Sequence, residues 1–460
     1  MADAVNTREL ALDILLSVTK HGTHSHTAIA GVLEKYQYLD KKDRAFLTRL
    51  AEGTLENLIR IDYIIGQFSK VPVSKIKPVI HCILRTGIYQ ISFMDAVPDA
   101  AACNEAVRLA KKKGFHNLSG YVNGVLRSIS RSKEAIPWPD PKTQPVRWLS
   151  VYYSMPEWII ELWTKEFHWD LHRPKDFTQM EQLLKAAAAQ APVTIRVNTA
   201  RCTKQQLIQR LAEEGVTAEP CTQPQEDVTA DPCTTQPPAA LCALKITGYD
   251  HIKALPSFQE GLFYVQDISS MLAAQAAAPG KDDFVLDVCA APGGKALQIA
   301  QMMQGSGHVL ARDLTPHKIQ LLKENIQRCQ TANIEAQQWD ATIPDPALYA
   351  KADIVIADLP CSGLGVMRRK KDIRYRITLP QIKELASLQR DILSVVSHYV
   401  KPGGKLIYST CTISRRENGE NTQWFLQTFP DFTLLQERQI LPKADGGDGF
   451  YIAQFLKARA

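Results

Sequence analysis

Two cysteines, each following a stretch typical of a β-strand, are the residues of this sequence best placed to do chemistry. Cys361 lies in Asp358-Leu-Pro-Cys-Ser-Gly363, directly after the apolar run Ile354–Ala357, and Cys411 lies in Ser409-Thr-Cys-Thr412. A thiolate of lowered pKa can add to C6 of a pyrimidine, which turns the weakly nucleophilic C5 into a carbon that attacks a methyl donor. A lone buried cysteine usually packs as a small apolar side chain, so the argument depends on the pair. Sequence order alone does not say which cysteine attacks.

Acidic residues follow four successive candidate strands: Asp287, Asp313, Asp340 and Asp358. In a parallel sheet the ligand crevice lies beyond the carboxyl ends of the strands, so these side chains would give the crevice a negative lining. Any one of them could instead cap a helix, but four in such positions favour a binding role. Asp358 can also hydrogen-bond the N3 and exocyclic amine of a cytosine as charge develops there.

A glycine-rich loop follows the first of these strands and reads Cys289-Ala290-Ala291-Pro292-Gly293-Gly294-Lys295. It has neither the G-x-G-x-x-G of dinucleotide binding nor the Gly-Lys-Ser/Thr of a phosphate-binding loop. Asp313 follows Gly293 by twenty residues, at the end of the next strand, where a carboxylate that binds ribose hydroxyls belongs. The sequence therefore predicts a site for a positively charged adenosyl cofactor.

The elements that must position these residues alternate between strands and helices from about residue 251 onward. Strands are predicted at 284–288, 308–311, 334–338, 354–357 and 405–409, with helices starting at 296, 316 and 379. Repeated strand–helix units predict a doubly wound parallel sheet, an α/β Rossmann-like domain over 251–460. The apolar stretches 432–435 and 450–456 could close this sheet with a hairpin.

The first 135 residues differ from the rest in pattern and charge. Helical apolar spacing recurs in 10–18, 45–58, 76–92, 100–112 and 119–129, which predicts an all-α domain over 1–135. This segment carries 19 Lys and Arg against 13 Asp and Glu, an excess equal to the net charge of +6 of the whole chain. Such an excess favours a polyanionic partner.

A linker with four prolines, 137–145, separates this domain from a small α+β domain predicted over 146–250. Residues 223–238, rich in Gln, Thr, Pro and Asp, predict a mobile loop. Cys221, Cys233 and Cys242 flank it, but their irregular spacing favours scattered thiols over a metal site. No signal peptide or membrane-spanning stretch is recognisable, and the ten cysteines show no paired spacing, so we expect a cytoplasmic protein.

Three motifs in order, Asp287–Lys295, Asp358–Gly363 and Ser409–Thr412, resemble those of the NOL1/NOP2/Sun family of RNA 5-methylcytosine methyltransferases, and Gln266–Ser270 is a further matching segment. Residues recurring in the NusB family of RNA-binding helical domains stand at Asp43-Arg44, Gly53, Arg85-Thr-Gly87 and Val122–Arg127. Together these features resemble the bacterial RsmB (Sun/Fmu) branch of the family, over nearly the whole chain. The resemblance implies a NusB-like domain that docks on RNA phosphates, where Lys and Arg supply most of the affinity.

The resemblance also implies a reaction and its residues. The reaction is S-adenosylmethionine-dependent methylation of cytosine C5 in 16S ribosomal RNA, at cytosine 967 in the family. Cys411 would be the nucleophile, and Cys361 would assist release of the product. Cofactor contacts carry over to Cys289–Lys295, Asp313, Asp340 and Asp358. The chain departs from the family pattern at Met155, where histidine is usual, at Leu359, and at Arg415-Arg416; only Met155 touches a possible RNA contact.

The stretch Asp358–Gly363, which contains Pro360 and Cys361, is called the Pro-Cys loop. A basic run, Arg368-Arg369-Lys370-Lys371, follows this loop, and its position favours contact with the RNA backbone over a merely solvated surface. The cytosine must be unstacked to be reached, which predicts a looped or locally opened RNA as substrate for a monomeric enzyme. Two other functions stay open. One is methylation of cytosine C5 in DNA or in another RNA. The other is RNA binding by a ribosome-assembly factor with a vestigial methyltransferase fold.

Overall fold

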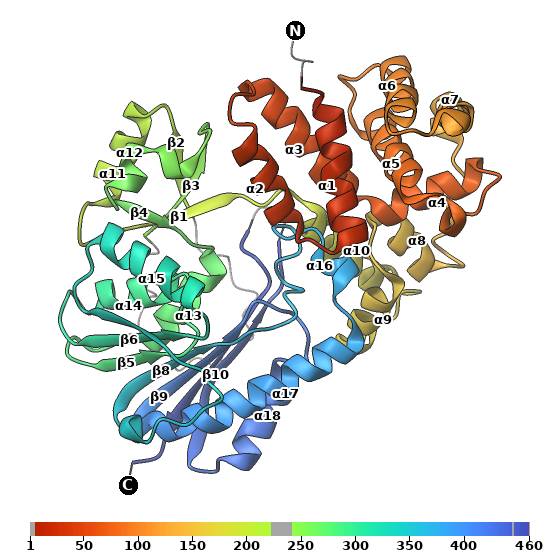
Figure 1. Cartoon of the computed structure of the whole chain (residues 1–460). Helices are drawn as coiled ribbons and strands as arrows, with labels where there is room; N and C mark the ends of the chain where they lie inside the picture. The colour runs from red at the N-terminus through yellow and green to blue at the C-terminus, as the bar shows by residue number, and fades with distance from the viewer. Residues whose placement is uncertain (1–4, 222–241, 444–445, 460) are drawn as a thin grey trace. The chain divides into compact units, whose positions relative to one another are not determined.

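The computed structural model describes residues 5–221, 242–443 and 446–459, and the chain forms two compact units (Figure 1). One unit comprises the chain up to residue 188 together with 367–376, and the other comprises 189–366 and 377–460. The loop predicted at 223–238, with Cys233, lies outside the described residues. The predicted division into domains 1–135, 146–250 and 251–460 does not coincide with the two units, because the helices between 145 and 188 belong to the first.

The first unit is helical. Its helices are α1 (Thr7–His21), α2 (Ser25–Lys35), α3 (Lys41–Glu56), α4 (Leu58–Phe68), α5 (Pro78–Phe93), α6 (Asp99–Lys112), α7 (Ser119–Ser132), α8 (Pro145–Tyr153), α9 (Glu157–Glu166), α10 (Pro174–Ala188) and α16 (Ile373–Arg376). The five helices predicted in the first 135 residues are present as α1, α3, α5, α6 and α7. Helices α2 and α4 were not predicted, and the predicted segment 45–58 ends earlier, because Asn57 separates α3 from α4.

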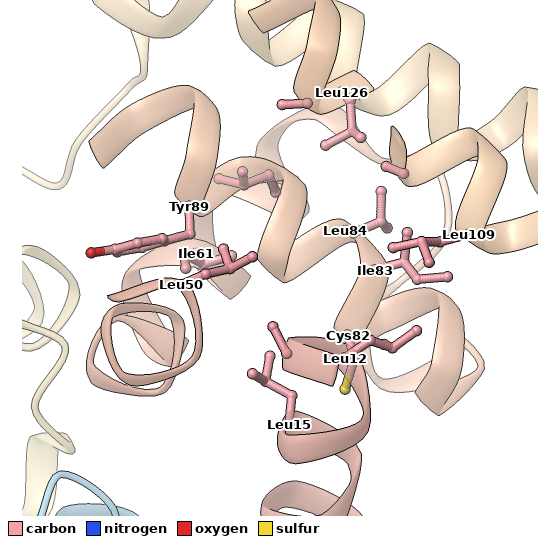
Figure 2. Close-up of a cluster of buried hydrophobic side chains, with 14 of the residues drawn as sticks. Leu12, Leu15, Leu50, Ile61, Cys82, Ile83, Leu84, Tyr89, Leu109 and Leu126 are labelled. Atoms are coloured by element: carbon pink, nitrogen blue, oxygen red, sulfur yellow. The ribbon is translucent and has the colours of Figure 1, made fainter. Parts of the chain in front are cut away.

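Apolar side chains from α1, α3, α4, α5, α6 and α7 meet in one core (Figure 2). Helix α5 lies at its centre, since Ile83, Leu84 and Tyr89 on it are fully or almost fully buried. Two glycines allow the helices to pack closely. A Cβ on Gly53 would lie 1.9 Å from the Tyr89 hydroxyl oxygen, and one on Gly87 would lie 2.9 Å from Leu126. These contacts give a packing reason for two of the residues matched to the NusB pattern.

Residues 367–376, which follow the Pro-Cys loop in sequence, are part of this helical unit. Asp372 is buried and accepts hydrogen bonds from the backbone N–H and the hydroxyl of Ser25, at the start of α2. Lys371 Nζ lies 2.6 Å from a Glu56 carboxylate oxygen, and the two side chains are 12% and 14% exposed. Arg374 is buried and donates to the Ala187 carbonyl. The segment therefore completes the helical unit through polar contacts.

This arrangement corrects part of the prediction for the basic run. Arg368 is only 2% exposed, and Lys371 is held by Glu56, so neither offers a free cation to RNA. Lys370 is exposed and Arg369 is half-buried. Met155 is also fully buried, so its departure from the family pattern concerns packing and not an RNA contact.

The second unit begins with a four-stranded antiparallel sheet in the order β2-β3-β1-β4. Its elements are β1 (Val193–Val197), α11 (Lys204–Glu213), β2 (Thr217–Pro220), β3 (Ala243–Thr247), α12 (Pro256–Gln259) and β4 (Phe263–Val265). Helix α11 begins with a reciprocal capping box between Thr203 and Gln206. The helix packs Leu207 and Leu211 against Ile195 and Val197. The small α+β domain predicted here is present.

A seven-stranded sheet forms the rest of the unit, in the order β10-β11-β9-β8-β5-β6-β7. Its elements are α13 (Ile268–Ala277), β5 (Phe284–Asp287), α14 (Gly294–Met302), β6 (His308–Asp313), α15 (Pro316–Cys329), β7 (Ile334–Gln338), β8 (Ala352–Asp358), α17 (Leu379–Val396), β9 (Val400–Thr410), α18 (Gly419–Thr428), β10 (Phe432–Ile440) and β11 (Phe450–Lys457). Strands β5 to β9 pair in parallel, and β10 and β11 form the predicted antiparallel hairpin.

Helices cover both faces of this sheet (Figure 1). Helices α13, α14 and α15 pack on one face, and α17 and α18 pack on the other, so the strands carry a separate apolar core on each side. This confirms the α/β Rossmann-like fold predicted for the C-terminal part, and a strand apolar on both faces, such as 354–357 in β8, is what such a sheet requires. Among the described residues no helix is long and apolar enough to cross a membrane.

We predict that Asp372→Ala destabilises the helical unit by about 1–3 kcal/mol, because it leaves two donors of Ser25 without their buried acceptor. Thermal or urea unfolding followed by circular dichroism measures this change. Lys370→Ala is the matched control, since Lys370 lies in the same segment and is exposed. Equal stability of the two variants would contradict the role given to the segment.

Candidate active site

The two predicted cysteines lie side by side at the carboxyl ends of β8 and β9. The parallel register pairs Asp358 with Ser409 at the last residues of the two strands, and each cysteine follows within three residues. The sulfur atoms of Cys361 and Cys411 are 3.2 Å apart, and both side chains are partly exposed. The structure therefore brings together two thiols that the sequence separates by fifty residues.

Backbone contacts hold the Pro-Cys loop against Cys411. The N–H of Leu359 donates to the carbonyl of Ser409, and the N–H of Gly365 donates to the carbonyl of Cys411. A Cβ on Gly365 would lie 2.1 Å from the carbonyl oxygen of Gly449 and 2.8 Å from that of Cys411. Only glycine allows this approach, so the loop closes tightly around Cys361.

The two thiols differ in their surroundings. The hydrogen bond with Cys411, together with burial, raises the pKa of Cys361 well above its usual value, and the nearby Glu417 carboxylate adds to the increase. Cys361 therefore keeps its proton at neutral pH and can donate it toward the Cys411 sulfur. At this separation one thiol can donate to the other and stabilise negative charge on its sulfur.

Asp358 is held in an ion pair. Its Oδ2 lies 2.6 Å from Lys295 Nζ, and its Oδ1 accepts from the Ser409 hydroxyl at 2.8 Å. Lys295 also donates to Ser270 and lies 5.3 Å from the centroid of the Phe450 ring. The predicted contact of Lys295 with the cofactor stays a prediction, and in the structure its ammonium group fixes the carboxylate of Asp358 beside the cysteine loops.

The glycine-rich stretch Cys289–Lys295 follows β5 as predicted, and α14 begins within it at Gly294, two residues before the predicted helix start. Gly293 has a φ of +111°, and a Cβ there would lie 2.8 Å from a Leu322 methyl group. Asp313, at the end of β6, accepts from the N–H of Ala291 at 3.0 Å. It also accepts from the N–H of Leu314 and pairs with Lys318. Asp313 thus fixes the position of the loop and lies at the strand end where the sequence predicted it. None of these contacts is a helix cap.

Asp287 and Asp340 occupy two further strand ends. Asp287 is 1% exposed, and no side chain among the described residues hydrogen-bonds its carboxylate. Burial raises the pKa of Asp287 to about 7, although Lys295 opposes the shift. Asp340 accepts from the N–H and the hydroxyl of Thr342. Burial raises the pKa of the Cys289 thiol as well, so Cys289 has the character of a packing residue.

Sequence reasoning missed several polar residues of the site. Ser270 and Ser409 lie within quoted motifs but were given no role, and each contacts the Lys295–Asp358 pair. Glu417 had no signal at all, because it is a single acid in a turn, and only the fold brings its buried carboxylate to Ser362. Among the described residues no cluster of three or more His, Cys, Asp and Glu side chains could hold a metal ion.

Comparison with known proteins accounts for this arrangement. The family described as 16S rRNA methyltransferase RsmB/F matches residues 274–456, the NusB family matches 5–131, and the ferredoxin-like domain of RsmF/B methyltransferases matches 155–229. A Bacillus subtilis protein described as a probable ribosomal RNA small subunit methyltransferase B is 35% identical, over 98% of each chain. The chain belongs to the RsmB branch of this family.

Other relatives agree with this assignment. The ribosomal RNA small subunit methyltransferase B of Vibrio cholerae is 31% identical over 98% of each chain. The solved structure of PH0851 matches with a TM-score of 0.78 and 23% identity over 99% of each chain. NSun6 from Pyrococcus horikoshii, solved with SFG, covers 66% of this chain and 99% of its own, with a TM-score of 0.55 and 22% identity. At these identities the two structures support the fold alone.

RsmB-type enzymes are S-adenosylmethionine-dependent methyltransferases, and the residues at the carboxyl ends of β5 and β6 suit that cofactor. Within the part of the chain that the structure describes, no side chain pairs with the buried Asp287 carboxylate, which fits a ligand that carries positive charge. The close backbone approach at Gly293 and the carboxylate of Asp313 border the same loop. Asp287, Asp313 and the loop Cys289–Lys295 would hold the cofactor, which supplies an activated methyl group when bound.

We predict that Asp287→Asn weakens binding of S-adenosylmethionine about 10- to 100-fold while stabilising the protein at alkaline pH. Burial raises the pKa of Asp287 from 3.8 to about 7, so the folded state holds this proton more tightly than the unfolded chain. The wild type therefore loses stability as pH rises from about 4 to about 7, whereas the neutral Asn does not. The melting temperature of the variant should exceed that of the wild type at pH 8, and the difference should shrink toward pH 5.

Calorimetric titration with the cofactor and thermal melts across this pH range provide the measurement. Asp282→Asn is the control, because Asp282 lies in the same region but is exposed. A stability difference for Asp287→Asn that is independent of pH would contradict the buried, ionisable carboxyl group. Unchanged cofactor affinity would remove Asp287 from the cofactor site.

Proposed function

We propose that this protein transfers a methyl group from S-adenosylmethionine to C5 of a cytosine in 16S ribosomal RNA, through a transient bond between Cys411 and C6. The 3.2 Å separation of Cys361 and Cys411 at the cofactor-binding edge of the sheet carries this proposal. Cytosine 967 is the target implied by resemblance to the family. The names of the relatives support small-subunit ribosomal RNA as the substrate.

In the proposed reaction the Cys411 thiolate adds to C6 of the cytosine. The electron pair of the C5–C6 double bond moves toward C5 and N3, and C5 then takes the methyl group. Loss of the C5 proton and departure of the Cys411 thiolate restore the double bond and release 5-methylcytosine. The raised pKa of Cys361 supports this division of roles, because the protonated thiol can stabilise an anionic sulfur at Cys411.

Asp358 has a separate role in the proposal. Lys295 and Ser409 hold its carboxylate beside the two loops, so it can accept from the exocyclic amine of the bound base. This bond would orient the ring with C6 toward Cys411. Cys361, as the second thiol, is proposed to assist release of the product, because its protonated thiol can donate toward the Cys411 sulfur as that sulfur leaves C6.

The proposed RNA partner would contact the NusB-like helices, which hold the excess of basic residues. Within residues 367–376, the exposed Lys370 and its neighbour Arg369 remain candidate phosphate contacts. The cytosine must leave its stack to reach the crevice, so an open or looped RNA is the proposed substrate. We retain the three-domain division, a monomeric state and a cytoplasmic location as parts of this proposal.

We predict that the two cysteine-to-alanine substitutions block different steps of the reaction. Cys411→Ala should abolish methylation and form no covalent adduct, because no other group can add to C6. Cys361→Ala should still attack and transfer the methyl group but release the product slowly, so it should accumulate a protein–RNA complex that survives denaturing electrophoresis. Incubation with 16S ribosomal RNA and S-adenosylmethionine, followed by electrophoresis and a 5-methylcytosine assay, measures both effects.

Cys202→Ala controls for loss of an unrelated thiol, since Cys202 is partly buried in the small sheet domain. A retarded band from Cys411→Ala and none from Cys361→Ala would reverse the roles and favour the mechanism of DNA cytosine methyltransferases. Equal methylation of duplex DNA and ribosomal RNA would contradict the substrate. Binding of RNA without any methylation by the wild type would favour the ribosome-assembly role.

A further inference from the structure

The loops that carry Cys361 and Cys411 extend beyond the hydrogen-bonded part of the sheet, whose last β8–β9 pair is Asp358 with Ser409. Backbone bonds fix the Pro-Cys loop at Leu359 and Gly365, which lie on either side of Cys361. The sheet and these two bonds hold the ends of the loop, and side-chain contacts are needed to fix the Cys361 sulfur between them. A separate set of side-chain contacts lies next to the cysteines.

Glu417 is at the centre of these contacts. It lies in the turn between β9 and α18, and its residue is fully buried. Its carboxylate accepts from the backbone N–H of Ser362 at 2.8 Å, from the Ser362 hydroxyl, and from Gln389 Nε2 at 3.2 Å. Because Ser362 directly follows Cys361 in the chain, the carboxylate binds the loop next to the thiol.

The same contacts reach the other cysteine through Thr412, which directly follows Cys411. The Ser362 and Thr412 hydroxyl oxygens are 2.8 Å apart. Since the Ser362 hydroxyl donates its proton to Glu417, it must accept the proton of Thr412. The chain of donors thus runs from Thr412 to Ser362 to Glu417, and its first two members each neighbour one of the cysteines.

The turn that carries Glu417 is itself held in place. The Tyr408 hydroxyl donates to the Glu417 carbonyl, and the Asn418 side chain bonds the Thr410 hydroxyl and the Thr412 carbonyl. Gln389, on α17, donates both to Glu417 and to the Pro360 carbonyl. A fully buried carboxylate is costly unless its oxygens receive several donors, and here the donors come from both cysteine loops and from α17.

We propose that Glu417 is a positioning residue, which fixes the spacing of Cys361 and Cys411 through Ser362 and Thr412. The part of this inference that concerns catalysis rests on the proposed function, whereas the part that concerns the spacing of the thiols does not. Ser362 and Thr412 transmit the constraint, and Glu417 anchors it. A carboxylate suits the position because both of its oxygens accept, whereas a glutamine amide offers one acceptor and requires the Ser362 hydroxyl to accept from it and so to reverse its bond with Thr412.

The spacing of the thiols can be measured without RNA by oxidation with diamide. This diazene takes two electrons and two protons from the thiol pair and becomes a hydrazine, while an S–S bond forms between Cys361 and Cys411. Disulfide formation in the full-length protein is followed by mass spectrometry of the linked peptide. We expect Ser362→Ala and Glu417→Gln to form it about tenfold more slowly than the wild type, because the two sulfurs are no longer held together.

Steady-state methylation of ribosomal RNA provides the second measurement. We expect kcat to fall about 100-fold in Glu417→Gln, with KM for RNA and affinity for S-adenosylmethionine unchanged, because misplacing a reacting group affects the chemical step. Glu420→Gln is the matched control, since Glu420 is exposed three residues further along. Calorimetric cofactor binding identifies folded variants, and Ser362→Ala, which keeps the N–H bond to Glu417, carries the test if Glu417→Gln does not fold.

Wild-type rates of disulfide formation in both folded variants would overturn the proposal. Slower disulfide formation with unchanged kcat would overturn the role in catalysis. If the wild type methylates no RNA but the variants form the disulfide more slowly, the spacing role is supported and the proposed function is refuted. Reduced kcat together with slower disulfide formation supports the proposal in full.

Discussion

The active site depends on one constraint, the parallel pairing of β8 with β9 that places Asp358 beside Ser409 at the strand ends. Parallel strands end at the same edge of a sheet, so residues fifty positions apart in sequence are brought into hydrogen-bonding distance. Side chains alternate between the faces of a sheet, and a shift of one residue would therefore point the Asp358 side chain away from Ser409 and Lys295. Burial of β8 on both faces specifies this register.

The acidic side chains at this edge of the sheet differ in how their negative charge is neutralised. Asp358 is neutralised by Lys295, and Asp313 by Lys318 and two backbone N–H groups, whereas the buried Asp287 has no side-chain partner among the described residues. Unpaired buried carboxylates are unfavourable, and proteins retain them mainly where a ligand supplies the missing charge. The uneven balance thus separates two acids that form ion pairs with a lysine from Asp287, which forms none among the described residues, and strand-end positions alone do not reveal this difference.

Much of the fold could be predicted because local signals agreed with tertiary structure. Pro316 at a helix start gave α15 its observed beginning, and the segment 334–338 predicted as a strand coincides with β7. Helices α2 and α4 were missed because α2 buries few residues and α4 follows α3 after a single residue, Asn57. The motifs located Cys361 and Cys411, but the roles of Lys295 and Glu417 arise from contacts across 63 and 55 residues, which no local pattern encodes. The burial of Arg368 could likewise not be predicted from the sequence, because a run of like charges usually indicates an exposed surface.

The helical unit is discontinuous, since residues 367–376 complete it from a distant part of the chain. During synthesis its first 188 residues precede this segment by about 180 residues, and at translation rates of 5–20 residues per second the delay is roughly ten to forty seconds. Over that interval Ser25 and Glu56 lack the Asp372 and Lys371 side chains that they bind in the finished protein. The helical unit can reach its final form only after most of the catalytic sheet, including β8 and Cys361, has left the ribosome.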